Sequence, residues 1–102
     1  MDSRIEIDIV QSHATAAAGL LKAFSNPHRL RLVCLLYRGE RSVSELADTL
    51  GLTQSNLSQH LAYLKRHRLV RAHREGASIF YTLAEHPAHD VLEILESVYG
   101  NH

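Results

Sequence analysis

Polar, uncharged side chains recur along one side of the segment between residues 54 and 66, which we call the reading helix. They are Gln54, Ser55, Ser58 and Gln59. Leucines at spacings of four and three occupy another side, at Leu57, Leu61 and Leu64, which is the pattern of an amphipathic helix. Amide and hydroxyl groups both donate and accept hydrogen bonds. Each base pair shows a distinct pattern of donors and acceptors in the major groove of DNA, where a helix fits. The polar side therefore has the chemistry needed to read base edges.

Positive charge follows the reading helix along the chain. The basic residues of this run are Lys65, Arg66, Arg68, Arg71 and Arg74, and no acidic residue lies between Asp48 and Glu75. A solvated surface normally mixes both signs, so a run of one sign favours contacts with phosphates. Five side chains are expected to hold the DNA backbone, namely Thr53, Lys65, Arg66, Arg68 and Arg74.

Local signals predict another helix directly before the reading helix. Ser42 and Glu45 have the spacing of a capping box, in which each side chain accepts a hydrogen bond from the backbone amide of the other residue. Gly51 can adopt the left-handed conformation that ends a helix, and Thr53 can cap the helix that follows. Two helices joined by a tight turn over residues 42–67 predict a helix-turn-helix.

A hairpin is predicted after the reading helix, over residues 70–83. Ile79, Tyr81 and Leu83 alternate with more polar neighbours, as in a strand, and Glu75 and Gly76 lie in a turn. Such a hairpin is the wing of a winged helix, and Arg74 near its tip could reach a phosphate or the minor groove.

Three further helices are predicted around this unit. The first covers residues 10–24 and is rich in alanine, the next begins at Pro27 after the capping residue Asn26, and the last covers residues 87–100. The apolar surface of the last helix is wide, and with the first helix it predicts a two-fold dimer interface. Residues 1–10 are expected to be a flexible tail or the lead-in to the first helix. The expected fold is a mainly α winged helix-turn-helix of order α-α-α-α-β-β-α, which forms a homodimer through its first and last helices.

Length and composition agree with one small domain over residues 1–102, which buries only about two-thirds of its unfolded surface. The formal net charge is zero, but residues 75–102 hold five acids and no lysine or arginine, so positive charge is concentrated in the middle of the chain. No apolar run approaches the roughly 18 residues that span a bilayer, and the first ten residues lack the features of a secretory signal. We expect a cytoplasmic protein with no membrane partner.

The sequence resembles the ArsR/SmtB family of bacterial transcriptional repressors from about Leu20 to Leu83. The resemblance lies in LKAFSNPHRLRLVCLL, then LSQHL, a basic helix end and an REG hairpin followed by an aromatic strand. Within the family the chain is most similar to the BigR/HlyU/NolR-like subgroup. The resemblance implies a winged-helix homodimer that covers an operator on double-stranded DNA and blocks transcription until an inducer binds. Two reading helices related by a two-fold axis predict that this operator is an inverted repeat. His60 matches a frequent histidine of the family's reading helix, and its spacing fits packing and DNA contact equally.

The inducer sites of the family match this chain only in part. Arsenic- and lead-type members carry two cysteines where this chain has Ser42 and Ser44. Zinc-type members carry ligand pairs on the last helix, and the residues of this chain in that region are His86, His89, Asp90, Glu93 and His102, at a different spacing. In the sulfide- and redox-responsive members of the subgroup, one cysteine lies at the position of Cys34 and a second stands where this chain has Gly100. This departure from the pattern removes the intrachain disulfide or polysulfide bridge that the resemblance would otherwise imply.

Cys34 has two interpretations. Val33 and Leu35 flank it in the most apolar predicted helix, which favours a small buried hydrophobic residue. It is otherwise an oxidisable or persulfidated thiol, which would make a redox or sulfur compound the inducer.

The alternatives to a redox-released repressor are a zinc-responsive repressor of the same family and a winged-helix module that binds only proteins. An enzyme is not expected, because no nucleophile, base and orienting group can be placed together by spacing. No cofactor is expected, since Gly51 and Gly76 belong to turns rather than to a phosphate loop.

Overall fold

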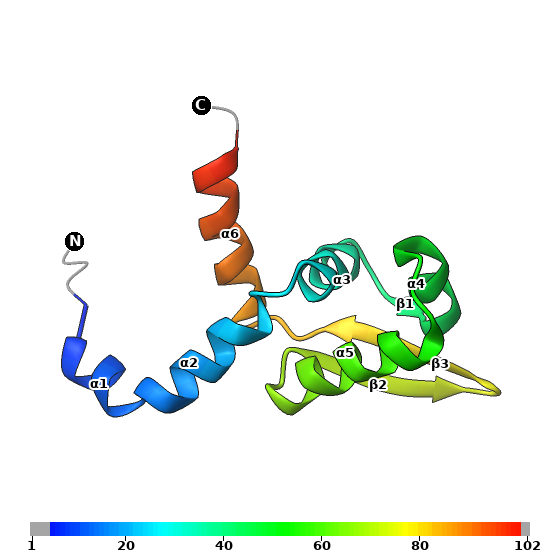
Figure 1. Ribbon diagram of the computed structural model, residues 1–102, viewed down its shortest axis with the longest axis horizontal. Helices are drawn as coiled ribbons and strands as arrows, with labels where there is room; N and C mark the ends of the chain where they lie inside the picture. The colour runs from blue at the N-terminus through cyan, green and yellow to red at the C-terminus, as the bar shows by residue number, and fades with distance from the viewer. Residues whose placement is uncertain (1–4, 101–102) are drawn as a thin grey trace.

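The computed structural model describes residues 5–100. Its elements in chain order are α1 (Ile7–Ser12), α2 (Ala14–Ala23), α3 (Pro27–Tyr37), β1 (Arg41–Ser42), α4 (Val43–Leu50), α5 (Gln54–Arg66), β2 (Val70–Glu75), β3 (Ser78–Leu83) and α6 (Ala88–Tyr99). Helices α3, α4 and α5 and the small sheet form a body, from which α2 with α1 and, separately, α6 extend as two arms (Figure 1). The winged helix-turn-helix expected from the sequence is confirmed.

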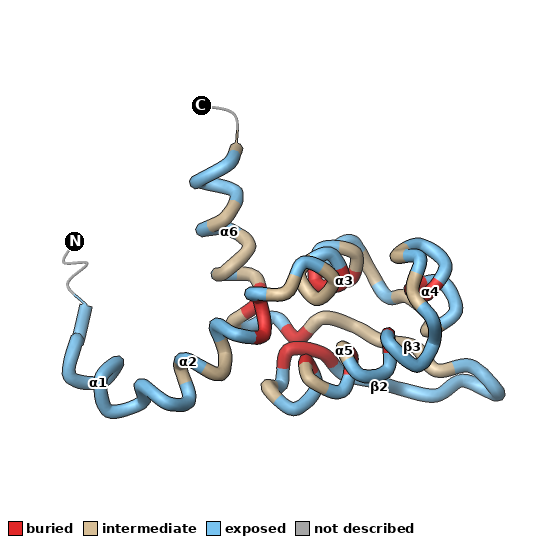
Figure 2. The backbone as a smooth tube through the Cα atoms, in the orientation of Figure 1, coloured by how far each residue is buried: buried red, intermediate tan, exposed pale blue. Residues whose placement is uncertain are grey.

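Aliphatic side chains fill the core where α3, α4 and α5 meet the end of α2. The largest fully buried side chains are Leu32, Val33, Leu46, Leu57, Leu61, Leu64 and Leu69. Burial is concentrated in this body and falls away along α1 and the outer part of α6 (Figure 2). The three leucines of the reading helix, now α5, thus fix which of its sides remains in solvent.

The expected capping residues are confirmed. The Ser42 hydroxyl accepts a hydrogen bond from the Glu45 amide at 3.1 Å, and the Glu45 carboxylate accepts one from the Ser42 amide at 2.8 Å. Asn26 caps α3, and Thr53 caps α5 by accepting from the Asn56 amide at 3.1 Å. Gly51 ends α4 with φ of 67°, where a glycine carries no side-chain penalty.

The sheet has three antiparallel strands in the order β1-β3-β2. The predicted hairpin is β2 and β3, which pair from Val70 opposite Leu83 to Glu75 opposite Ser78. Gly76, with φ of 62°, is the first residue of the two-residue connection, where a hairpin turn favours glycine. Strand β1 was not expected, because two residues are too few to show an alternating pattern.

The N-terminal arm differs from the single predicted helix over residues 10–24. Helix begins at Ile7, before the predicted start at residue 10, and the arm is interrupted at His13 between α1 and α2. The Ile9 carbonyl, which an uninterrupted helix would offer to the His13 amide, instead lies 2.8 Å from the Ser12 hydroxyl and 2.9 Å from His13 Nδ1. Such side-chain bonds compete with the helical ladder and account for the break.

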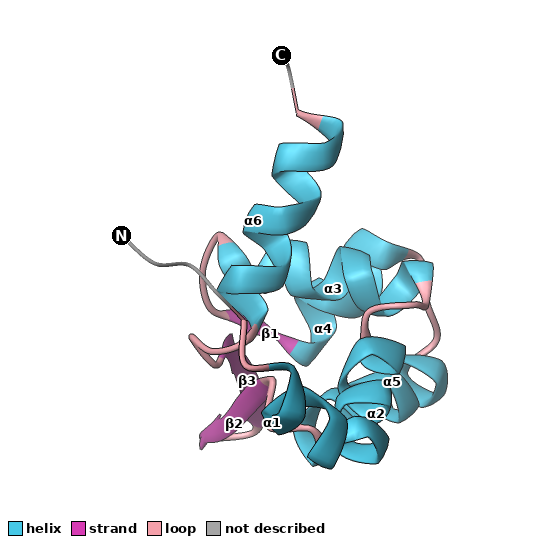
Figure 3. Cartoon of the chain, turned by 90° about the vertical axis from the view of Figure 1, so that its left-hand side faces the viewer, coloured by secondary structure: helices cyan, strands magenta, loops and turns pink. Residues whose placement is uncertain are grey.

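Both arms carry exposed apolar side chains. They are Ile7, Ile9, Val10 and Leu21 on the N-terminal arm and Ile94, Val98 and Tyr99 on α6. No residue of α1 is buried, and the outer turns of α6 project away from the sheet and α5, while its first residue, Ala88, belongs to the core (Figure 3). Among residues 5–100, no helix combines the length and apolar character that crossing a membrane requires.

Candidate nucleic-acid interface

The polar side of α5 is open to solvent, as its sequence pattern predicted. Gln54, Ser55, Ser58 and Gln59 are all exposed, whereas Leu57, Leu61 and Leu64 are at most 2% exposed. Thr53 uses its hydroxyl oxygen to cap the helix, which leaves the hydroxyl hydrogen free to donate. The structure therefore presents the four amide and hydroxyl side chains together on one rigid element.

Tyr63 anchors the opposite end of α5 to two other helices. The Arg29 guanidinium lies 4.3 Å from the centre of the Tyr63 ring, and it also donates to the carbonyl oxygens of Ala23 and Lys22, each at 2.9 Å. Arg29 thereby joins the end of α2 to α3 and α5. The sequence did not reveal this role of Arg29, because it depends on contacts with residues of α2 and α5 that are distant in the chain.

Helix α2 also approaches the end of α5 closely. A Cβ atom added at Gly19 would lie 3.1 Å from Cε1 of His67, and the His67 ring packs against Tyr63 with centroids 4.9 Å apart. Gly19 weakens the helix in isolation but allows this approach. The orientation of the reading helix therefore depends on the N-terminal arm.

The basic side chains lie at the C-terminal end of α5 and on the wing. Lys65, Arg66, Arg68 and Arg74 are all exposed, and Arg66 also extends over the Tyr63 ring at 5.3 Å from its centre. Arg68 has φ of 61°, a conformation that glycine would adopt with less strain. The backbone bond from the Leu69 amide to the Leu64 carbonyl, at 2.9 Å, closes the helix around this residue.

The wing places Arg74 opposite Ile79, one residue pair from the turn. His73, next to it, lies on the other face of the strand and stacks on Phe80 with centroids 5.6 Å apart. The imidazole of His73 also lies 3.2 Å from Glu40 and 3.5 Å from Glu75. These two acids are paired with His73, so they occupy the face of the wing opposite to Arg74.

His60 packs against α3. Its ring is half-buried, with its centroid 5.6 Å from that of His28. Burial, followed by the positive charge of Arg29 and the neighbouring His28, lowers the pKa of His60 below its usual value. This arrangement favours the packing interpretation of His60 over a DNA contact.

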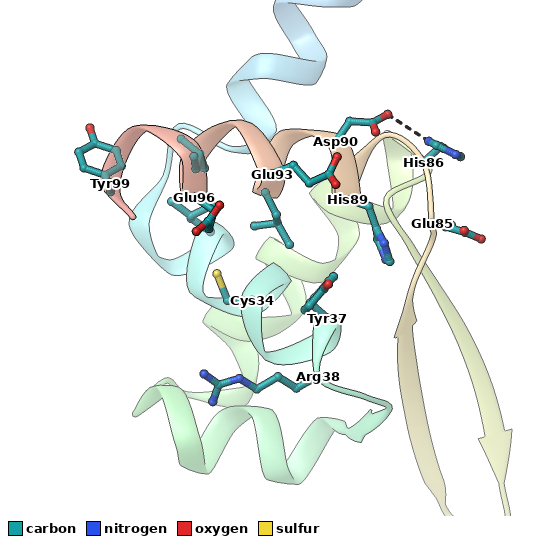
Figure 4. A pocket seen from close by; sticks show the side chains of 13 residues that line it. Cys34, Tyr37, Arg38, Glu85, His86, His89, Asp90, Glu93, Glu96 and Tyr99 are labelled. Carbon is teal, nitrogen blue, oxygen red and sulfur yellow. Dashed lines mark hydrogen bonds and ion pairs between the residues drawn. The ribbon is translucent and has the colours of Figure 1, made fainter. Parts of the chain in front are cut away.

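Cys34 is exposed, which overturns the interpretation of this residue as a buried hydrophobic side chain. It lines a groove of about 830 Å³ between α3 and α6, with Tyr37, His89 and Glu93 (Figure 4). Leu32, Val33 and Leu36 face the core from the same helix. The apolar neighbours in the sequence therefore did not reveal that α6 leaves this side of α3 open.

The histidines considered as zinc ligands lie along the same groove. His86 Nδ1 is 3.1 Å from the Asp90 carboxylate, while His89 meets the Tyr37 ring edge-on with centroids 4.9 Å apart (Figure 4). Glu93 is exposed one turn further on, and His102 lies outside the described residues. Between residues 5 and 100, no three histidine, cysteine, aspartate or glutamate side chains are close enough together to hold a metal ion.

Comparison with known proteins identifies the family. The sequence pattern of the bacterial regulatory proteins of the arsR family matches residues 26–72, from the cap of α3 to the middle of β2. The transcriptional activator HlyU of Vibrio cholerae serotype O1 is 41% identical over 90 residues, which cover 88% of this chain and 83% of HlyU. This chain belongs to the arsR family of bacterial regulatory proteins.

Other members resemble this ArsR-family chain over nearly its whole length. The biofilm growth-associated repressor of Agrobacterium fabrum is 40% identical over 95 residues, which cover 93% of this chain and 81% of that protein. The crystal structure of NolR from Sinorhizobium fredii is 34% identical, with a TM-score of 0.85, and 100% of each chain is covered. These proteins confirm the expected subgroup, and their family is one of regulators rather than enzymes.

Proposed function

We propose that this ArsR-family protein binds an inverted-repeat operator as a homodimer and represses transcription. The observation that carries the proposal is the exposed polar face of α5, bordered by Lys65 and Arg66 at its end and by Arg74 on the wing. Gln54, Ser55, Ser58 and Gln59 read bases, while Thr53, Lys65, Arg66, Arg68 and Arg74 hold phosphates. HlyU is named an activator and the biofilm growth-associated protein a repressor, so transcriptional control is common to these two relatives.

DNase footprinting on the promoter of the protein's own gene tests this proposal. Two reading helices related by a two-fold axis should protect two half-sites about 34 Å, or one helical turn, apart. A titration against random duplex of equal length is the control, and we expect at least about a 10³-fold preference for the protected site. Equal affinity for both duplexes would contradict sequence-specific regulation.

The homodimer follows from the apolar surfaces of the two arms. Ile94, Val98 and Tyr99 are 58–83% exposed in the single chain, more than a small soluble domain normally leaves uncovered on one helix. Val98→Glu should produce monomers in sedimentation velocity, because the carboxylate would be buried at the interface. Ser97→Glu adds the same charge outside the apolar stripe and should remain a dimer.

A thiol-reactive inducer is the second part of the proposal. The exposure of Cys34 in the α3–α6 groove supports reactivity rather than core packing. We expect Cys34→Ser to bind the operator with unchanged affinity and to lose its release by polysulfide, which transfers sulfane sulfur to the thiolate and leaves as a shorter polysulfide, or by peroxide. Unchanged release in the variant would contradict this role, and calorimetry with zinc on the purified protein tests the metal-responsive alternative.

A further inference from the structure

A second groove, of about 480 Å³, lies between the reading helix, the N-terminal end of α4 and the tip of the wing. Its polar lining comes from segments far apart in the sequence. The residues are Ser42 of β1, Ser44 of α4, Gln54, Ser58 and Lys65 of α5, and Ser78 and Tyr81 of β3. Tertiary folding thus brings one cation and several hydroxyl groups to the same concave surface.

The donors of this groove are not used within the protein. In the part of the chain that the structure describes, no ion pair engages Lys65, and no side-chain hydrogen bond engages Ser44, Ser58 or Ser78. No acidic residue lines the groove. Glu45 stands at the same end of α4, but its carboxylate already accepts the hydrogen bond of the Ser42 amide.

The side chains that line this groove indicate which class of ligand it would bind. An ammonium group with several hydroxyls supplies donors and a single positive charge, which suits a phosphodiester, an acceptor-only group with one negative charge. A metal cation is disfavoured, because neither carboxylate nor imidazole lines the groove.

The position of the groove indicates that this phosphodiester belongs to the DNA backbone. One wall, formed by Gln54 and Ser58, belongs to the base-reading face, and the opposite wall is the wing strand that follows the turn at Gly76. When the reading helix enters the major groove and the wing lies beside it, the DNA strand between them must cross this concave surface.

We propose that the groove binds one phosphodiester of the DNA backbone in each half-site. Lys65 supplies the charge, and the hydroxyls of Ser44 and Tyr81 supply hydrogen bonds. Ser78 is not included, because it pairs with Glu75 and its side chain lies on the other face of the wing. This inference rests on the proposed operator binding and adds two contact residues from outside the reading helix. Its physical effect is to set the register of α5 along the DNA, because phosphate contacts position a protein whereas base contacts specify the sequence.

A scan with uncharged phosphates tests the site. In the duplex protected in footprinting, single phosphates are replaced by methylphosphonates, and fluorescence anisotropy measures the dissociation constant of wild type, Lys65→Ala and Tyr81→Phe. We expect one phosphate per half-site whose replacement weakens wild type about fivefold, the size of an exposed ion pair. At that phosphate Lys65→Ala and Tyr81→Phe should each lose less than wild type, because the remaining groups still bind it.

Arg66→Ala is the matched control, because Arg66 follows Lys65 on α5 but does not line the groove. It should retain the full loss at the phosphate that Lys65 binds. If wild type binds the duplex while Lys65→Ala stays as sensitive as wild type at every phosphate, the groove site is wrong and operator binding stands. If wild type fails to bind the duplex, both proposals fall.

Inorganic phosphate separates the DNA backbone from a free anion as the occupant. At constant ionic strength, phosphate should weaken the operator complexes of wild type and Lys65→Ala to the same extent. Relief of phosphate inhibition in Lys65→Ala, with an unchanged methylphosphonate pattern, would assign the groove to a free anion and overturn the proposal.

Discussion

The salt dependence of operator binding follows quantitatively from the exposed cations. Each protomer exposes Lys65, Arg66, Arg68 and Arg74, so a homodimer would bring about eight to the duplex, and the slope of log K against log salt should be about −7. Between 50 and 200 mM salt, a slope of that size weakens binding by about 2 × 10⁴-fold. A chain with zero formal net charge would show no such dependence if its charges were evenly mixed.

Arg74→Ala tests whether the wing contributes to this slope. Removal of one cation per protomer leaves about six contacts, so the slope should change to about −5 and the loss over the same salt range to about 2 × 10³-fold. Arg71→Ala is the control, because Arg71 is exposed on the same strand but points to the opposite face. Fluorescence anisotropy titrations at four or five salt concentrations measure both slopes. An Arg74→Ala slope equal to that of wild type would refute the placement of the wing on DNA.

Four further predictions follow from single residues. Gln59→Ala should lose about 1–3 kcal/mol of discrimination at one base pair of each half-site, measured with single-base variants of the operator. Leu57→Ala, at a position with 0% exposure, should lower the free energy of unfolding in urea by about 2–5 kcal/mol. Arg68→Gly should raise the unfolding free energy by up to about 1 kcal/mol, because φ of 61° is strained for arginine, while it weakens DNA binding. The pKa of His60 is lowered in the folded protein, so near that pKa the unfolded chain binds more protons than the folded one. The free energy of unfolding should therefore fall as the pH drops below about 6.5. Urea titrations at several pH values should show a weaker pH dependence for His60→Gln than for wild type.

Helix ends and turns were predictable from the sequence because each depends on residues a few positions apart. The capping box of Ser42 and Glu45, the left-handed Gly51 and the cap Thr53 all formed as expected. The same holds for the leucine face of α5, whose spacing determines which side can enter the core. Exposure of Ser58 and Gln59 then follows, since they lie away from that face, whereas Gln54 continues the leucine stripe and is exposed as the first residue of α5.

The break at His13 shows where local reasoning fails even within one helix. Alanine content predicted continuity, but two side chains compete for the Ile9 carbonyl. Helix propensity is summed over the whole segment, so it does not predict where side chains take a single backbone carbonyl away from the helical hydrogen-bond ladder.

Taken alone, the sequence determined the reading helix, its caps, the wing and the run of positive charge, because periodicity and short-range hydrogen bonds encode them. Only the tertiary structure decided which groups meet across elements. Packing of α6 leaves Cys34 exposed, Arg29 joins α2 to Tyr63, and Lys65 and Ser44 line the same groove. The physical reason is that these contacts depend on the relative positions of whole helices and strands, which the packing of the entire core sets and no local pattern records.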